Sequence, residues 1–413
     1  MDRILQTRLS GMMFLEFFVW GAWYVTVGNY MTTLGMEDHI YLAYMVNPLA
    51  AIVSPFFLGM VADRFFDTEK IMGVLHIVGG VFMFLAPIVA ETTGSVTLFI
   101  LMLLLHNLCF APTLSLVNSL SFHHLTDQEK QFPVIRVLGT IGWIAAGVFV
   151  SGILHADLTA IPLYISGGSG LLMGLYCFSL PHTPPLAKGE KATFREISGI
   201  DALSKLNSRS FVVFIVASFL ICIPLQAYYT YAPVYINAAD LADPAFKMSF
   251  GQMSEVVFML LMPLFFARLG VKWMLMTGML AWVLRYGLFA AAAPSGILWM
   301  IMLGILLHGI CYDFFFVTGQ IYVDKKSTKA IRGQAQGFLT LATLGAGMFV
   351  GALVSGALFN SVVTNNIERA LGQWQVFWVI PAAFAGLIAI IFFILFKEDF
   401  EEKPSIAEVS SPA

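Results

Sequence analysis

Long apolar runs follow one another along almost the whole chain, separated by short polar breaks. A run of about 20 predominantly apolar residues is long enough to cross the hydrocarbon core of a bilayer as a helix. The pattern predicts an all-α membrane protein with twelve transmembrane helices, over residues 9–33, 41–62, 71–90, 96–120, 133–155, 160–180, 211–236, 249–267, 272–293, 297–322, 333–359 and 374–396.

The longest polar break, around residues 181–210, contains several prolines and basic residues and leaves six spans on either side. We therefore expect an N-terminal six-helix half over 1–181, a cytoplasmic linker over 182–210 and a C-terminal six-helix half over 211–397. Residues 398–413 are polar and largely acidic, a composition typical of a disordered tail.

Short motifs recur between the two halves at a spacing close to half the chain length. The pairs are HNLCF (106–110) with HGICY (308–312), AWY (22–24) with AYY (227–229), and IR (135–136) with IR (331–332). Three matches in the same order indicate a parallel duplication of a six-helix unit. In transporters built from repeats, the substrate site lies near the middle of the membrane, between the halves.

Composition supports the membrane interpretation. Charged residues make up 11% of the chain, whereas about 25% is usual in soluble domains. The net charge of −3 gives no reason to expect a nucleic-acid partner. The four cysteines all lie inside apolar runs, which argues against a disulfide framework.

Lysine and arginine indicate the orientation. If the N-terminus is cytoplasmic, only Lys247 and Arg369 of the 22 Lys and Arg residues fall in outside loops, and only Arg136 and Arg285 fall within spans. Cytoplasmic loops carry the excess of positive charge in multi-pass proteins. We therefore expect both termini in the cytoplasm.

Five ionisable residues fall inside the predicted spans: Glu16, Arg136, Glu255, Arg285 and Asp313. A charged side chain at the membrane centre costs about 2.5 to 3.5 kcal/mol on insertion scales, so it usually faces a protein interior or a water-filled path. Two interpretations stay open, namely structural ion pairs or snorkelling side chains on the one hand, and a transport site on the other. For Arg285, in a span expected at the periphery, pairing with a carboxylate is the simpler explanation.

Helical spacing places polar residues of two spans on common faces. Gln252 and Glu255 are three residues apart and share one face, where an amide beside a carboxylate offers both donors and acceptors. Arg136, Thr140 and Trp143 form one stripe, on which a guanidinium and an aromatic ring could hold a planar ligand.

Two further spans carry polar residues at depth. His308 and Tyr312 share a face, while Asp313 points about 100° away from Tyr312. Gln226 lies deep in a span beside tyrosines 228, 229 and 231, which fit either a site or an interfacial aromatic belt. The chain has no Walker loop, no Cys/His zinc spacing and no nucleophile elbow. We therefore expect transport driven by a gradient, with neither cofactor nor metal.

The loop between the second and third spans resembles the loop signature of the major facilitator superfamily. GMVADRF at 59–65 carries Gly59, Asp63 and Arg64 of that signature, and these positions imply a structural and gating role. Phe66 and Asp67 depart from it, because a glycine and a basic residue are usual there. The resemblance implies the major facilitator fold, with two pseudo-symmetric six-helix halves.

A more specific similarity, over nearly the whole chain, is to the nucleoside:H+ symporter family of bacterial nucleoside permeases. The motifs that carry it are WGAW (20–23), GNYM (28–31), GMVAD (59–63), PTLSLVNSLS (112–121), FPVIRVLGTIGW (132–143), QMSE (252–255), AWVLRYGLF (281–289), YDFF (312–315) and AIRGQAQGF (330–338).

That resemblance implies proton-coupled nucleoside uptake across the bacterial cytoplasmic (inner) membrane by alternating access, performed by a monomer in the lipid bilayer. It places the nucleoside cavity at Arg136, Thr140, Trp143, Gln226, Tyr229, Gln252, Glu255, His308 and Tyr312. Asp313 and Glu255 would couple protons, with Glu16 in reserve, and Arg285 would have a structural or gating role.

Three departures from the family pattern leave the choice between purine and pyrimidine nucleosides open. Tyr229 replaces an Asn, His308 replaces a Tyr, and Glu16 replaces a Gln.

Two other functions fit parts of the sequence. A major facilitator carrier for another polar solute, such as a sugar, would show the same spans. A membrane-embedded enzyme would need a catalytic cluster at one membrane face, and the adjacent His123 and His124 are the one hint of it.

Overall fold

Every predicted span is helical in the part of the chain that the computed structural model describes, which is residues 3–57, 65–185, 206, 208–328, 331–364 and 371–398. The first half contains α1 (Arg3–Tyr24), α2 (Val27–Thr33), η1 (Glu37–His39), α3 (Ile40–Phe57), α5 (Thr68–Thr93), α6 (Val96–His124), α7 (Gln128–Gly147), η3 (Val148–Ile153) and α8 (Ile161–Cys177).

The second half contains α11 (Arg209–Ala238), α12 (Pro244–Ala292), η4 (Ala293–Ser295), α13 (Leu298–Leu306), α14 (His308–Tyr312), η5 (Asp313–Val317), α15 (Thr318–Lys326), α16 (Arg332–Thr340), η6 (Leu341–Gly347), α17 (Met348–Val362) and α18 (Leu371–Leu395). The predicted boundaries of the linker and the tail stay predictions, because residues 186–205, 207 and 399–413 lie outside the described residues.

Helix length agrees with the twelve predicted spans. Among the described residues, ten helices are long and apolar enough to cross a membrane, and α8 is a shorter apolar helix. One of the ten, α12, runs through two predicted spans and breaks at Gly270, whose φ of 66° is a conformation that glycine adopts without strain. Three spans contain π-helical segments, η3, η5 and η6, and such segments often occur at functional sites.

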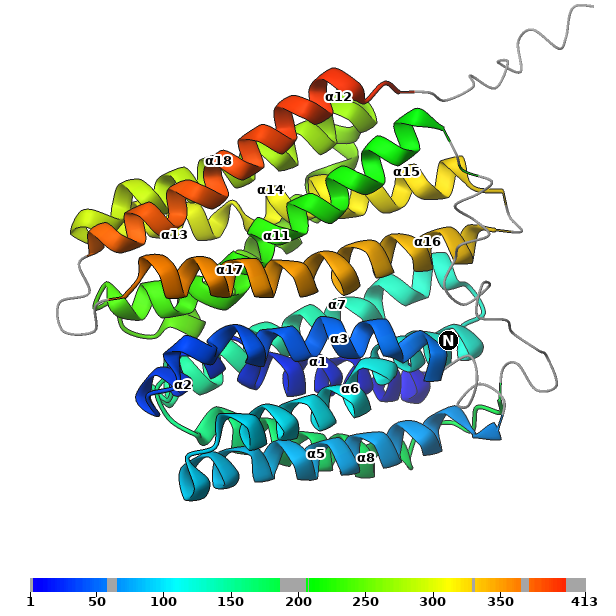
Figure 1. The fold of residues 1–413 in the computed structure, drawn as a ribbon. Coiled ribbons are helices and arrows are strands. Elements are labelled where there is room, and N and C mark those ends of the chain that lie inside the picture. Colours follow the sequence, from blue (N-terminus) through cyan, green and yellow to red (C-terminus); the bar gives the residue numbers. More distant parts are fainter. Residues whose placement is uncertain are drawn as a thin grey trace, which may run out of the picture.

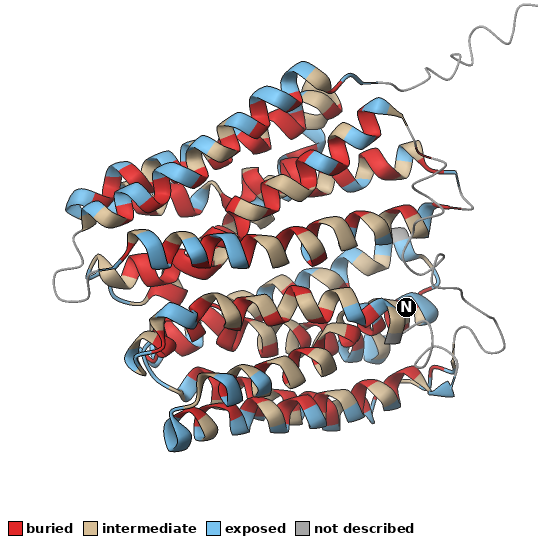
Figure 2. Cartoon of the chain, in the orientation of Figure 1, coloured by how far each residue is buried: buried red, intermediate tan, exposed pale blue. Residues whose placement is uncertain are grey.

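The two halves lie side by side (Figure 1), the first running from blue through cyan to the green of α8 and the second from brighter green to red. Along the outer helices, such as α5 and α18, exposed and buried faces alternate (Figure 2), as expected where one side meets lipid. The end of the bundle that carries the N-terminus is called the near face below. The opposite end, with α2, η1 and residues 154–160 and 239–243, is called the far face.

Glycines in α7 and α17 permit close helix packing. A Cβ at Gly142 would collide with the Phe14 carbonyl of α1, and one at Gly139 would press on the ring of Phe17. In α17, a Cβ at Gly351 would lie 2.7 Å from Gln226 Cβ of α11. These glycines therefore bring the helices that carry site residues into direct backbone contact.

In each half, two of the three repeated motifs contact each other in the same way, which supports the inferred duplication. In the first half, His106 of HNLCF packs edge-on against Trp23 of AWY, with ring centroids 5.9 Å apart. In the second half, His308 of HGICY stacks on Tyr228 of AYY at 5.5 Å. The third pair has diverged, because Arg332 forms an ion pair with Asp324 (2.8 Å) whereas Arg136 lies deeper in its helix.

Polar contacts join the two halves at the far face. His155 Nδ1 lies 2.6 Å from Asp243 Oδ1, and the N–H of Ala245 donates to Asp157 Oδ1 at 2.9 Å. Asn29 and Asn360 add side-chain bonds to backbone carbonyls of the opposite half, those of Pro233 and Asp38. The far face is therefore closed in this conformation.

Asp157 gives this closed face a dependence on pH. Burial raises the pKa of the Asp157 carboxyl, although Ser151 and the Ala245 N–H both donate to it. A carboxyl whose pKa is higher in the folded than in the unfolded state stabilises the fold while it is protonated. This stabilisation is lost as the pH rises from the unfolded-state pKa, about 4, through the higher pKa of the folded state.

We expect Asp157→Asn, which keeps an acceptor for Ala245 but cannot titrate, to gain thermal stability relative to wild type as the pH rises from 4 to 7. Asp157→Ala loses both bonds and should cost about 1–3 kcal/mol at every pH. Melting temperatures of the purified protein across that range measure both effects. A wild type and Asp157→Asn variant that respond in parallel to pH would contradict the role given to Asp157.

Candidate functional site

A cavity of about 450 Å³ lies between the two halves, near the middle of the bundle. It extends toward the near face, since it reaches Ser54 and Pro55 near the end of α3 and Asn118 near the end of α6. On its far side, Tyr24 of α1 and Tyr229 of α11 meet across the halves with ring centroids 6.2 Å apart.

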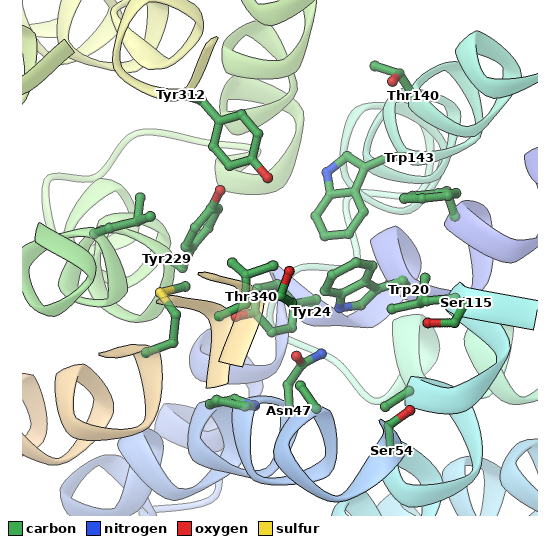
Figure 3. A pocket seen from close by; sticks show the side chains of 18 of the residues that line it. Trp20, Tyr24, Asn47, Ser54, Ser115, Thr140, Trp143, Tyr229, Tyr312 and Thr340 are labelled. Carbon is green, nitrogen blue, oxygen red and sulfur yellow. The ribbon is translucent and has the colours of Figure 1, made fainter. Parts of the chain in front are cut away.

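All nine residues expected at the nucleoside site line this cavity. They are Arg136, Thr140, Trp143, Gln226, Tyr229, Gln252, Glu255, His308 and Tyr312. Figure 3 shows Tyr229 and Tyr312 on one side of the space, with Trp143, Trp20 and Thr140 on the other. The structure therefore brings together the nine residues that the family resemblance places at the site, and their roles stay predictions.

The first-half wall is the stripe of Arg136, Thr140 and Trp143 on α7. The Arg136 guanidinium lies 4.4 Å from the centre of the Phe17 ring, an arrangement that favours a cation. Trp143 packs edge-on against Trp20 at 5.1 Å. Arg136 therefore lines the cavity with its guanidinium packed on a ring, and its role in transport stays a prediction.

The second-half wall provides hydrogen-bonding groups. Gln226 donates to Thr230 at 2.9 Å, while its Oε1 has no partner among the described residues. Gln252 Oε1 is likewise buried and unpartnered in the described part of the chain. Glu255 interacts electrostatically with Arg136 of the opposite wall. The cavity thus presents a cation and a carboxylate from different halves, with unpaired amide oxygens beside them.

The tyrosines of α11 do not form an interfacial belt. Tyr228 and Tyr231 are fully buried in the packed interior, and Tyr229 faces the cavity. The alternative that assigned them to a belt was wrong, because α11 is surrounded by other helices along most of its length.

Among the described residues, Arg285 does not have the carboxylate partner expected for it. Its Nε donates to the Gly304 carbonyl (3.1 Å), its Nη2 bonds His308 Nδ1 (3.1 Å), and its guanidinium stacks 4.0 Å from the centre of the Tyr228 ring. The expectation failed because α12 packs against α13 and α14, so that backbone, imidazole and ring groups surround the guanidinium in place of an acid.

Two of the proposed proton-coupling carboxylates are not among the cavity-lining residues. Asp313 is fully buried at the start of the π-helical η5, and neither of its oxygens has a hydrogen-bond partner in the described chain. Glu16 is also fully buried, but it lies 2.8 Å from His76 Nε2 and accepts a bond from Thr113 (2.7 Å). Gly59, Asp63 and Arg64 lie outside the described residues.

Sequence reasoning missed a group of cavity residues in other spans. They include Trp20, Tyr24, Asn47, Ser54, Ser115, Asn118 and Thr340. It also missed His76 as the partner of Glu16. A signal was present for Asn47 and Asn118, because an amide inside an apolar run raises the same question as a charge, although the cost is smaller. His123 and His124, the hint of an enzyme, lie at the end of α6, where His124 bonds Thr183.

The chain is similar to known nucleoside transporters over nearly its whole length. A family model described as nucleoside H+ symporter matches residues 3–401. YegT of Escherichia coli is 38% identical over 410 residues, with 97% of this chain and 95% of YegT covered. The nucleoside permease NupG of Escherichia coli is 31% identical over 411 residues, covering 95% of this chain and 96% of NupG. The crystal structure of the nucleoside transporter NupG superposes with a TM-score of 0.84 at 29% identity, covering 97% of this chain and 100% of that one.

Arg136 provides a direct test of the first-half wall. We expect Arg136→Lys to weaken ligand binding nearly as much as Arg136→Ala, roughly 10- to 100-fold, because a flexible ammonium does not replace a planar fork stacked on a ring. The dissociation constant of a nucleoside, measured with each purified variant, tests this. Arg8→Lys, at the end of the bundle that carries the N-terminus, is the matched control. Wild-type binding by Arg136→Lys would show that only charge, and not the fork, is needed.

Proposed function

The chain belongs to the nucleoside H+ symporter family, and we propose that its central cavity binds the nucleoside while buried carboxylates next to it carry the coupled proton. The protein is a transporter of the major facilitator fold and not an enzyme. The observation that carries the proposal is the cavity itself, where all nine expected residues meet between the halves.

The size and chemistry of the cavity suit a nucleoside. About 450 Å³ lies within the usual range of small-ligand sites, roughly 300–1,000 Å³. Trp143 and Tyr312 offer aromatic surface for a planar base, and Gln226, Gln252 and Glu255 offer groups for hydroxyls or base edges. These groups come from both halves, so a bound nucleoside would touch both at once.

The positions at which the halves touch fit transport by alternating access. In the present conformation the far face is closed by the contacts of His155, Asp157, Asn29 and Asn360, while the cavity extends toward the near face. Releasing these contacts and bringing the near-face ends together would expose the same cavity to the other side.

The orientation and oligomeric state complete the proposal. The excess of Lys and Arg in the segments at the near face supports a cytoplasmic position for both termini. The present conformation would then face the cytoplasm, and nucleosides would enter the cell with protons. We also propose that one chain is sufficient, since the cavity is built within it.

Two carboxylates fit proton coupling for different reasons. Glu255 lines the cavity and interacts electrostatically with both Arg136 and Asp313. Asp313 is buried without a hydrogen-bond partner among the described residues, and an unpaired charge at that depth is costly. Such a group is expected to exchange a proton during the cycle. Glu16 is the reserve candidate, and its bonds to His76 and Thr113 also fit a structural link between α1, α5 and α6.

We expect Glu255→Gln and Asp313→Asn each to separate binding from accumulation. Each variant should bind a nucleoside within roughly tenfold of the wild-type Kd, a difference of about 1.4 kcal/mol, yet fail to concentrate it in proteoliposomes under an imposed pH gradient. An amide keeps the shape but cannot exchange a proton. Glu16→Gln is the matched comparison, a buried carboxylate outside the cavity.

If both variants still concentrate uridine while Glu16→Gln does not, the coupling role moves to Glu16. If all three still do, none of these carboxylates is required.

The polar groups of the cavity also predict how substrates are distinguished. A site built to pair hydroxyls rejects analogues that lack them, because its own buried groups are left unmatched. We expect ribonucleosides to compete well against labelled uridine or adenosine, 2′,3′-dideoxynucleosides poorly and free bases hardly at all. Nucleotides should be excluded, since Arg136 is the one Lys or Arg residue among the cavity-lining residues described. Competition by uracil or adenine as strong as by its nucleoside would show that ribose is not recognised.

A further inference from the structure

The two histidines that the internal repeat makes equivalent have opposite hydrogen-bonding partners. His106 Nδ1 lies 2.9 Å from the carbonyl oxygen of Gly79, and its Nε2 has no partner among the described residues. His308 Nδ1 lies 3.1 Å from Nη2 of Arg285. A carbonyl can only accept a hydrogen bond, whereas a guanidinium can only donate one. His106 therefore carries its proton on Nδ1, and His308 must accept on Nδ1.

This contact fixes the chemical state of the His308 ring. With the Nδ1 lone pair occupied by Arg285, a neutral imidazole carries its single proton on Nε2. The charged imidazolium would need a second N–H directed at the guanidinium, where two donors and two positive charges would oppose each other. Arg285 is fully buried and held by Gly304 and Tyr228 as well, so it cannot easily turn away.

The Nε2 atom of His308 is directed toward the cavity and has only distant partners. It lies 3.5 Å from the Tyr229 hydroxyl and 3.9 Å from Glu255 Oε2. His308 also packs against the rings of Tyr228 and Tyr312. Other charged and titratable groups lie around this ring. Arg136 faces Glu255 across the cavity. Cys311 and Tyr286 lie beside Arg285.

We propose that Arg285 is a positioning residue that holds His308 as a neutral Nε2–H tautomer, so that the cavity presents a constant hydrogen-bond donor to an acceptor atom of the nucleoside. The proposal rests on the proposed nucleoside site and adds a specificity-determining residue to it. It also means that His308 does not carry the coupled proton, because its ring keeps one state while Glu255 beside it changes charge.

The ring state is measured directly by ¹⁵N NMR of histidine-labelled protein, with the His308 signals assigned by their loss in His308→Gln. We expect a neutral ring with the proton on Nε2 at every pH from 5 to 8. In Arg285→Met, which fills the same space without charge or donor, nothing occupies the Nδ1 lone pair, so the proton should no longer be confined to Nε2 and an Nδ1–H signal should appear. A wild-type ring that titrates, or that carries its proton on Nδ1, overturns the proposal.

Binding measurements test the donor. His308→Gln places an N–H close to the position of Nε2 and can accept from Arg285, so the nucleoside Kd should change little. His308→Phe should weaken binding roughly tenfold, as expected for one lost hydrogen bond. His106→Gln, the equivalent change outside the cavity, is the control. Equal loss in the Gln and Phe variants would show that the donor has no role.

Comparing uridine with 2′,3′-dideoxyuridine locates the acceptor. If His308 donates to the 2′- or 3′-hydroxyl of the ribose, His308→Phe should leave the weak binding of the dideoxy analogue unchanged. If it donates to the base, the 5′-hydroxyl or the ring oxygen, all of which the dideoxy analogue retains, both ligands should weaken in parallel. A neutral Nε2–H ring in a protein that binds no nucleoside would instead leave the tautomer assignment standing and refute the proposed function.

Discussion

The cost of placing an ionisable group inside a membrane protein without a partner determines how this chain is organised. In the described part of the structure, four of the five intramembrane charges meet this cost by different contacts. Arg285 lies among imidazole, carbonyl and ring groups, Glu16 is bonded to His76 and Thr113, and Arg136 and Glu255 face each other across the cavity. Asp313 has no hydrogen-bond partner there. Of the five groups, Asp313 is therefore the least stabilised in its charged form. This is why we propose that it exchanges a proton.

The duplicated architecture supplies two similar frameworks, which the chain uses differently. In each half, a histidine packs on an aromatic residue of the half's first helix: His106 on Trp23 of α1, and His308 on Tyr228 of α11. In the first half this histidine bonds a backbone carbonyl and remains outside the cavity, whereas in the second it bonds Arg285 and reaches the cavity wall. A small change of partner thus converts a packing residue into one that can contact substrate.

Much of the fold could be predicted because its signals are local in sequence. The length of an apolar run decides whether it spans the bilayer, and helical spacing decides that Arg136, Thr140 and Trp143, or Gln252 and Glu255, share a face. The partner of Arg285 could not be predicted, because it depends on how α12 packs against α13 and α14. The contact between Glu16 and His76 likewise joins residues 60 positions apart. The π-helical turn at Asp313 changes the local helical register, which a regular 100° rotation per residue does not anticipate.

If one cavity between the halves couples nucleoside movement to protons, as we propose, uptake by the wild-type protein should depend on a proton gradient. The measurement is accumulation of radiolabelled uridine in proteoliposomes with and without an inward proton gradient, before and after addition of a protonophore. We expect uridine to accumulate above its outside concentration only while the gradient lasts. Uridine uptake that only equilibrates in both conditions, or a gradient that concentrates a sugar but no nucleoside, would contradict it.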